Sequence, residues 1–140
     1  MNIEEITLIL PNKIGIERVA RECSSSYAKI LGFEASKIED IKTAVTEACL
    51  NAIEHGNRGN IKAKVSVNMG FDGRGLIISV RDEGKGILHK IKKPNIDDKI
   101  KGLEKIRGFG IFLIENLMDK VSFEKSDENG HIVKMVKYLE

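Results

Sequence analysis

The sequence predicts an α+β protein, a two-layer sandwich in which helices cover one face of a mixed, mostly antiparallel sheet. Two patterns support this prediction. Apolar residues recur at helical spacing through residues 13–56, and alternation of apolar and polar residues begins at residue 64. Helices and strands that are grouped in this way, rather than alternating one by one, are typical of α+β folds. The chain has 140 residues and no internal repeat, so we expect one domain, residues 1–140.

The chain is expected to begin with a strand and a helix. Residues 3–10 are rich in Ile and Leu and predict a strand that Pro11 ends. From Lys13 onward, apolar residues at helical spacing predict a helix that ends at Gly32, because glycine is the usual residue after a helix C-terminus.

A second helix follows. Ser36 and Glu39 have the spacing of a capping box, in which the two side chains satisfy the first backbone N–H groups. Apolar residues then continue on one side of the helix, and Gly56 with the polar cluster at 57–60 ends it.

The C-terminal half predicts two hairpins joined by a polar stretch and a helix. Strands at 64–69 and 76–80 flank a glycine turn. Residues 88–107 are polar and basic, which indicates a lid or a disordered loop. Residues 111–118 predict a buried helix, and the strands at 120–125 and 131–139 follow it.

Composition excludes several classes of protein. The 23 basic and 21 acidic residues give a net charge of +2, which provides no field for a polyanion, and there is no Trp for base stacking, so we expect no nucleic-acid partner. No apolar run reaches the length of a membrane span, and no signal peptide is apparent. Cys23 and Cys49 lack metal-site spacing, so we expect reduced thiols in a cytoplasmic protein.

The first candidate fragment lies on the second helix. Glu47, Asn51 and His55 are spaced i, i+4, i+8 and would share one helical stripe. Such a stripe is often only a solvated polar face. However, Asn is a poor helix former in mid-helix, and amide and carboxylate oxygens are ligands suited to Mg²⁺.

The second fragment follows a predicted strand. Asp82 precedes Gly84 and Gly86, and glycines allow a backbone to approach a ligand closely. An acid at this position could accept a hydrogen bond from an exocyclic amine such as adenine N6. The alternative is an ordinary hydrophilic turn.

The third fragment opens a helix. Arg107, Gly108, Phe109 and Gly110 precede the predicted helix at 111–118, where unsatisfied N–H groups and the helix dipole favour phosphate. A glycine hinge without a ligand is the alternative. The fragment lacks the ending of a P-loop and the strand–helix–strand setting of a dinucleotide fingerprint.

Taken together and in this order, the three fragments resemble the N, G1 and G2 boxes of the GHKL (Bergerat) ATP-binding fold. Residues 40–56 and 110–119 are especially similar to the anti-sigma-factor serine/threonine kinases within that superfamily. The resemblance covers essentially the whole chain. Histidine kinases and gyrase-type relatives need further domains, which we do not expect here.

The resemblance implies roles for individual residues. Asn51 matches the family's Mg²⁺ ligand, and Glu47 matches the general base that accepts the proton of the attacking hydroxyl. Asp82 matches the acid that reads adenine N6, and Gly84 and Gly86 match the turn beneath the nucleotide. ATP or ADP with Mg²⁺ is therefore the implied ligand.

At the phosphate end, Gly108 and Gly110 match the family's glycines near the phosphates, and Arg107 is the matching phosphate contact. Phe109 and His55 complete the set of expected nucleotide-binding residues. The alternative for His55 is a position behind the residues that bind the nucleotide and metal, or simply at the end of the helix.

Residues 88–107 would be the ATP lid. One departure from the family lies elsewhere: many relatives have a Thr near the start of the last strand, close to adenine. Here His131 follows Gly130, so that hydroxyl is missing, and we expect His131 to be an exposed strand residue without a role.

The resemblance also implies partners: a second copy of the chain, a sigma factor, and a STAS-domain anti-anti-sigma protein as the substrate. Glu17 and Arg21 on the first helix are candidates for sigma docking, although an intrahelical ion pair is the simpler interpretation. The leading prediction is a serine kinase that sequesters a sigma factor. The alternative is a nucleotide-gated binding module with little kinase activity, for which Glu47 would be unnecessary.

Overall fold

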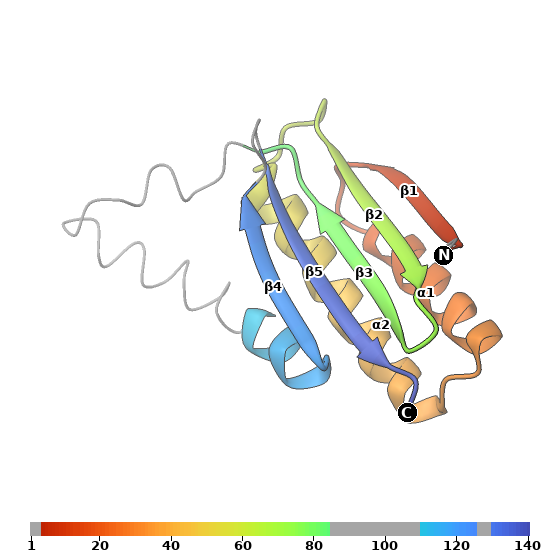
Figure 1. The fold of residues 1–140 in the computed structure, drawn as a ribbon. Helices are drawn as coiled ribbons and strands as arrows, with labels where there is room; N and C mark the ends of the chain where they lie inside the picture. Colours follow the sequence, from red (N-terminus) through yellow and green to blue (C-terminus); the bar gives the residue numbers. More distant parts are fainter. Residues whose placement is uncertain (1–3, 85–109, 126–129) are drawn as a thin grey trace.

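The computed structural model describes residues 4–84, 110–125 and 130–140 (Figure 1). In chain order the elements are β1 (Glu5–Pro11), α1 (Glu17–Leu31), α2 (Ala35–Asn51), the π-helical turn η1 (Ala52–Gly56), β2 (Lys64–Phe71), β3 (Gly75–Arg81), a helix at 110–117, β4 (Lys120–Lys125) and β5 (His131–Tyr138). The expected order of strand, two helices, hairpin, helix and hairpin is confirmed. The predicted lid at 88–107 lies outside the described residues.

The five strands of the described residues form one sheet in the order β1-β2-β3-β5-β4, and each of the four pairings between them is antiparallel. Apolar residues align across the middle of the sheet, where Val67 pairs with Leu8 and Val80, and Val80 pairs with Val133. This register places alternate residues on one face, as the period of two predicted.

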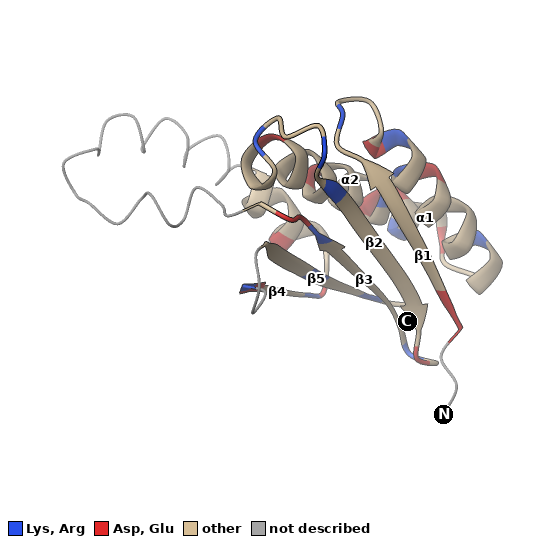
Figure 2. Ribbon diagram, turned by 90° about the horizontal axis from the view of Figure 1, so that it is seen from above, with Lys and Arg blue, Asp and Glu red and all other residues tan. Residues whose placement is uncertain are grey.

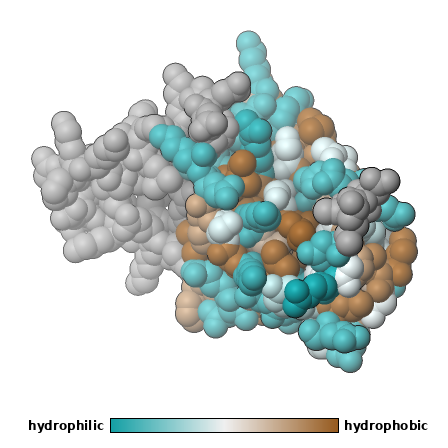
Figure 3. All heavy atoms as spheres, viewed as in Figure 1, coloured by the Kyte–Doolittle hydropathy of each residue, from teal (hydrophilic) through white to brown (hydrophobic). Residues whose placement is uncertain are grey.

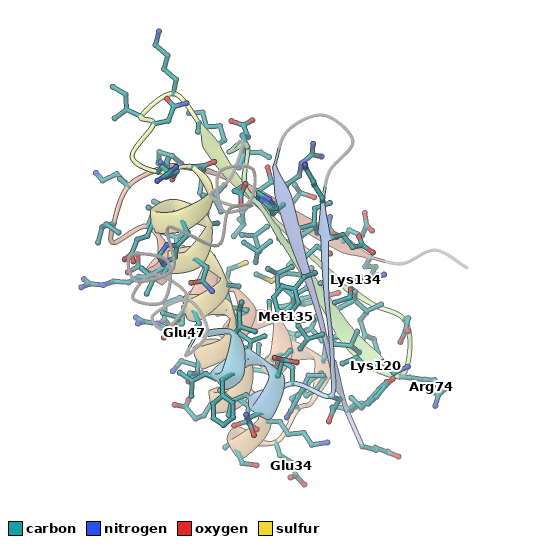
Figure 4. All side chains as sticks on the ribbon, turned by 90° about the vertical axis from the view of Figure 1, so that its left-hand side faces the viewer. Glu34, Glu47, Arg74, Lys120, Lys134 and Met135 are labelled. Atoms are coloured by element: carbon teal, nitrogen blue, oxygen red, sulfur yellow. The ribbon has the colours of Figure 1, made fainter. Side chains whose placement is uncertain are left out.

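Helices α1 and α2 cover the same face of the sheet (Figures 1 and 2). The core lies between the two layers. Ile41 and Val45 of α2, with Val67, Ile78 and Met135 of the sheet, have no exposed surface. Figure 4 shows the alternation on β5, because Met135 points to the helices and its neighbour Lys134 lies on the other side of the sheet. The α+β sandwich predicted from sequence is therefore confirmed.

None of the described helices covers the opposite face of the sheet, which mixes hydrophilic and hydrophobic atoms (Figure 3). On β2 the residues that face this side are polar, Ser66 and Asn68, whereas Ile77 of β3 and Val136 of β5 are half-buried. No helix among the described residues has the length and hydrophobicity that crossing a membrane requires.

Two expected helix starts differ from the structure. The first helix begins at Glu17 rather than Lys13, because Gly15 has a φ of 106° that no helix allows. Its end at Gly32, with a φ of 94°, is as predicted. The capping box at Ser36 is wrong: α2 already begins at Ala35, and no side chain caps it.

The helix at 110–117 is amphipathic rather than buried all round. Ile114 is fully buried, whereas Phe112 is 59% exposed. The C-terminal end of this helix is held by the buried Lys137 of β5, whose ammonium donates to the backbone oxygen of Leu117 and to Asp40 of α2, with the latter bond at 3.1 Å. One buried cation thus joins the sheet to both helices.

Candidate active site

The end of the second helix widens into a π turn. The N–H of Asn57 donates to the carbonyl of Ala52 at 2.8 Å, a spacing of five residues where an α-helix has four. His55, the last member of the expected stripe with Glu47 and Asn51, therefore lies in this π turn rather than in the α-helix itself. His55 is buried within the turn, at 7% exposure.

The π turn brings Gly56 against the segment that follows β3. A Cβ atom added to Gly56 would overlap the carboxyl group of Asp82, and one added to Gly84 would overlap the carbonyl of Gly56. Neither glycine needs a positive φ, so what requires glycine here is the close approach of two chain segments. Gly56, predicted only to end a helix, therefore forms one wall of the site.

Asp82 is 4% exposed and lies at the floor of this contact. Its Oδ1 accepts hydrogen bonds from the backbone N–H groups of Gly84 at 3.0 Å and His131 at 3.1 Å. Burial raises the pKa of Asp82, and the neighbouring His131 imidazole and these two hydrogen bonds oppose that rise. The result is a desolvated carboxyl group held in one orientation, as recognition of a ligand donor requires.

A buried amide holds the turn after Asp82 in place. Asn57 donates to Oδ1 of Asn12 at 3.2 Å and to the carbonyl of Lys64 at 3.0 Å, and its own Oδ1 accepts from the N–H of Glu83 at 2.7 Å. Sequence reasoning placed Asn57 in a terminating loop and missed this role. In a sequence, an Asn that only follows the end of a helix looks the same as an Asn that also holds a neighbouring turn in place.

The first and third fragments meet at the other end of the site. A Cβ atom added to Gly110 would lie 3.2 Å from Oε2 of Glu47 and 3.3 Å from Nδ2 of Asn51. Glu47 and Asn51 are one turn apart on α2, about 6 Å along the axis. The start of the 110–117 helix therefore lies directly against these two side chains, as their predicted roles require.

The chemistry of these side chains suits Mg²⁺. A carboxylate and an amide oxygen lie together, and the described residues contain no group of three His, Cys, Asp or Glu that could hold a metal by themselves. Mg²⁺ is commonly held by one or two protein oxygens, with water and phosphate completing its shell. Asn51 could supply such an oxygen.

A groove of about 350 Å³ runs between α1 and α2 and reaches Glu47. Arg21 lines it from α1, and Lys42 and Thr46 line it from α2. Figure 4 shows Glu47 on α2, well separated from Glu34 at the beginning of the same helix.

Four expected site residues, Gly86, Arg107, Gly108 and Phe109, lie outside the described residues.

The expectation for His131 is wrong. Its side chain is buried beside Asp82, with Nδ1 3.4 Å from Oδ1 of the carboxyl group. The pairing of Arg81 with Ile132 places Asp82 opposite His131 in the antiparallel register, and this register was the one signal that could have revealed their proximity.

The simple ion pair considered on the first helix is also absent. Glu17 is buried and accepts a hydrogen bond from the N–H of Gly15 at 2.7 Å, whereas Arg21 contacts Glu22 at 3.2 Å. Glu17 therefore fixes the beginning of α1, and Arg21 remains at the groove.

The chain matches the family model described as "Histidine kinase-like ATPase domain" over residues 11–137. It is 35% identical to a serine-protein kinase RsbW of Oceanobacillus iheyensis over 99% of this chain and 89% of that protein. It is 34% identical to an anti-sigma F factor of Bacillus subtilis over 88% of this chain and 84% of that protein.

Two solved structures share the fold. The RsbU and RsbW domains of a Mycobacterium tuberculosis protein match with a TM-score of 0.67 at 20% identity, over 97% of this chain and 32% of that one. The SiaB-SiaC complex of Pseudomonas aeruginosa matches with a TM-score of 0.61 at 15% identity, over 96% of this chain and 89% of that chain.

Proposed function

This chain belongs to the histidine kinase-like ATPase family, and from that premise we propose that it is an ATP-dependent serine/threonine protein kinase that also acts as an anti-sigma factor. The observation that carries the proposal is the position of Glu47, which lies beside Asn51 and Gly110 and also opens into the groove between α1 and α2. One carboxylate can therefore face both a nucleotide and an incoming hydroxyl. The relatives named serine-protein kinase and anti-sigma F factor support both halves of the function.

We propose that ATP lies along the C-terminal half of α2, with its base at Asp82 and its phosphates at Asn51 and Gly110. The buried carboxyl of Asp82 accepts a hydrogen bond from adenine N6. Gly56 and Gly84 let the two chain segments beneath the base approach each other, because a side chain on either glycine would overlap the other segment. Mg²⁺, held with the help of Asn51, would neutralise charge on the phosphates.

Glu47 is the proposed general base. Its carboxylate orients the Ser or Thr hydroxyl of the acceptor and takes the hydroxyl proton as the oxygen attacks the γ-phosphorus. The bond from that phosphorus to the β–γ bridging oxygen breaks at the same step, and ADP leaves. In phosphoryl transfer most of the rate comes from positioning and charge neutralisation, and a positioned base contributes typically ~10²–10⁴-fold. The rigid placement of Glu47 on a helix suits this role.

The acceptor protein is proposed to be a STAS-domain anti-anti-sigma protein that enters along the groove beside Arg21. A sigma factor is the second proposed partner, and we place the function in the cytoplasm within one domain of residues 1–140.

We also propose a homodimer. Its support is that β1 is an edge strand and that Ile9 on it is 63% exposed. Light scattering of the purified chain tests the dimer, which a monomer mass would overturn.

The kinase function is tested by incubating the full chain with Mg-ATP and each STAS-domain protein of its source organism. Mass spectrometry of the STAS protein should show one added phosphoryl group on a Ser or Thr. Glu47→Gln should transfer far less phosphate in this assay, and Glu34→Gln is its matched control, because Glu34 is an exposed carboxylate at the start of the same helix and makes no side-chain capping bond. Binding of Mg-ATP without transfer to any candidate would favour the nucleotide-gated binding module instead.

A further inference from the structure

The buried ammonium of Lys137 has two partners, and they belong to two different helices. Its Nζ donates to the backbone oxygen of Leu117, the last residue of the 110–117 helix, and to Oδ2 of Asp40 on α2 at 3.1 Å. Only 8% of Lys137 is exposed. Taking an ammonium out of water costs free energy that its partners do little more than offset, so such a pair contributes little to stability. What its directional bonds supply is a fixed position of one helix against the other.

The same two helices meet again at the candidate catalytic end. The 110–117 helix starts at Gly110, whose added Cβ atom would lie 3.2 Å from Oε2 of Glu47. This helix therefore runs antiparallel to α2, from Glu47 at its start to Asp40 at its end. The two spans match, because Gly110 and Leu117 are seven residues apart and so are Asp40 and Glu47. Seven residues correspond to about 10.5 Å of helix, so a shift at Leu117 is carried to Gly110.

Two other attachments of this helix constrain its position along α2 less strictly. Ile114 is fully buried in the core, but apolar contact is non-directional and tolerates sliding along the helix axis. The N–H of Asp119 donates to the carbonyl of Val136 at 2.9 Å, which ties the chain after the helix to β5 and not to α2. Lys137 binds both helices at once and therefore fixes their relative position.

We propose that Lys137 is a positioning residue for phosphoryl transfer, which holds the 110–117 helix at the place along α2 where Gly110 borders Glu47 and Asn51. This role depends on the kinase function proposed above. Lys137 acts through the helix and takes no part in the chemical step. Because a misplacement of about 1 Å at reacting groups can cost 10²-fold in rate, a helix released from Lys137 should slow the transfer.

The test is single-turnover phosphoryl transfer from Mg-ATP to the STAS-domain acceptor by Lys137→Met, which keeps the length of the side chain and removes the ammonium. The rate constant should fall about tenfold, the loss expected for a displacement of roughly 0.5 Å. A protein that is only partly folded would lower the amplitude of the reaction and leave its rate constant unchanged. Lys134→Met is the matched control, because Lys134 is exposed on the opposite face of the same strand, and it should match wild type.

Asp40→Asn gives a second variant, which serves even if Lys137→Met does not fold. The Asp40 side chain is 36% exposed, and Asn keeps an oxygen that can accept from the ammonium but has no charge. Its rate constant should fall by a smaller factor, about threefold. The double variant should be no slower than Lys137→Met, because both substitutions act through one contact, and losses that multiply would overturn the proposal.

A measurement that needs no acceptor protein is the NMR signal of the Asn51 side-chain amide. Asn51 lies about 16 Å along α2 from Asp40, so a purely local effect of the substitution does not reach it. The signal should shift in Lys137→Met and stay in place in Lys134→Met.

The two proposals fail in different ways. An unchanged rate constant in Lys137→Met, or an Asn51 signal that does not move, would overturn the positioning role and leave the kinase function intact. No transfer by the wild-type protein to any acceptor would overturn the kinase function itself, and the Asn51 signal would still decide whether Lys137 positions the helix.

Discussion

Gly110→Ala should separate catalysis from stability. The added methyl carbon would lie 3.2 Å from Oε2 of Glu47, inside the roughly 3.5 Å at which such contacts become optimal, so the carboxylate must move by about 0.3 Å. A misplacement of about 1 Å can cost 10²-fold in rate, so this smaller shift predicts a loss of roughly three- to tenfold in kcat. The fold should not suffer, because Gly110 has no positive φ that an Ala would strain.

The assay is the rate of phosphoryl transfer at saturating Mg-ATP and acceptor, together with the melting temperature by circular dichroism. Asn116→Ala is the control, because it also replaces a poor helix former in the same helix, at an exposed position. That variant should melt no lower than wild type and keep the wild-type kcat. A Gly110→Ala protein with full kcat would refute the close approach to Glu47, and one that fails to fold would refute the stability reasoning.

Three further substitutions test the base end of the site. Gly84→Ala forces a methyl group into the carbonyl of Gly56. ATP binding measured by calorimetry should therefore be lost, and the free energy of unfolding measured in urea should fall by about 1–3 kcal/mol. Normal ATP binding would contradict the close approach of Gly84 to Gly56. Asn57→Ala removes three hydrogen bonds and should cost about 3 kcal/mol of unfolding free energy, and a cost near zero would mean that water replaces the amide. Asp82→Asn should raise the melting temperature at neutral pH while abolishing ATP binding. The pKa of Asp82 is raised in the fold, so ionisation of this carboxyl group disfavours the native state. Wild-type stability is therefore lost as pH rises through that pKa. In acid, where Asp82 is protonated, the higher melting temperature of Asp82→Asn should vanish. An Asp82→Asn protein that is less stable than wild type at neutral pH would reverse this sign.

Much of the architecture was predictable because it depends on local rules. Gly32 ends a helix through a left-handed conformation that few other residues adopt, and the alternation of residues in 64–69 and 76–80 aligns their apolar faces whatever lies around them. Asp82 and Gly84 were identified for the same reason, since glycine after a strand indicates a close backbone approach. Their contact with Gly56 depends on the fold.

The remaining features come from tertiary contacts that no local pattern encodes. The π turn at Ala52–Gly56 adds one residue where α2 meets the Asp82 segment, and a sequence read at 3.6 residues per turn extends the helix straight through it. His131 was expected to be exposed because strand position alone does not tell which face is covered at the end of β5. Asn57 is identified only by its three partners, two of which are distant in sequence.

The central claim is that Glu47 performs catalysis rather than binding. The measurement is single-turnover phosphoryl transfer to the STAS-domain acceptor by Glu47→Gln, paired with the dissociation constant for Mg-ATP. We predict a rate lowered by about 10²–10⁴-fold with an unchanged dissociation constant, because Gln keeps the size of the side chain and loses only its basicity. Transfer at the wild-type rate would contradict the account, and so would a loss of rate that follows entirely from lost ATP binding.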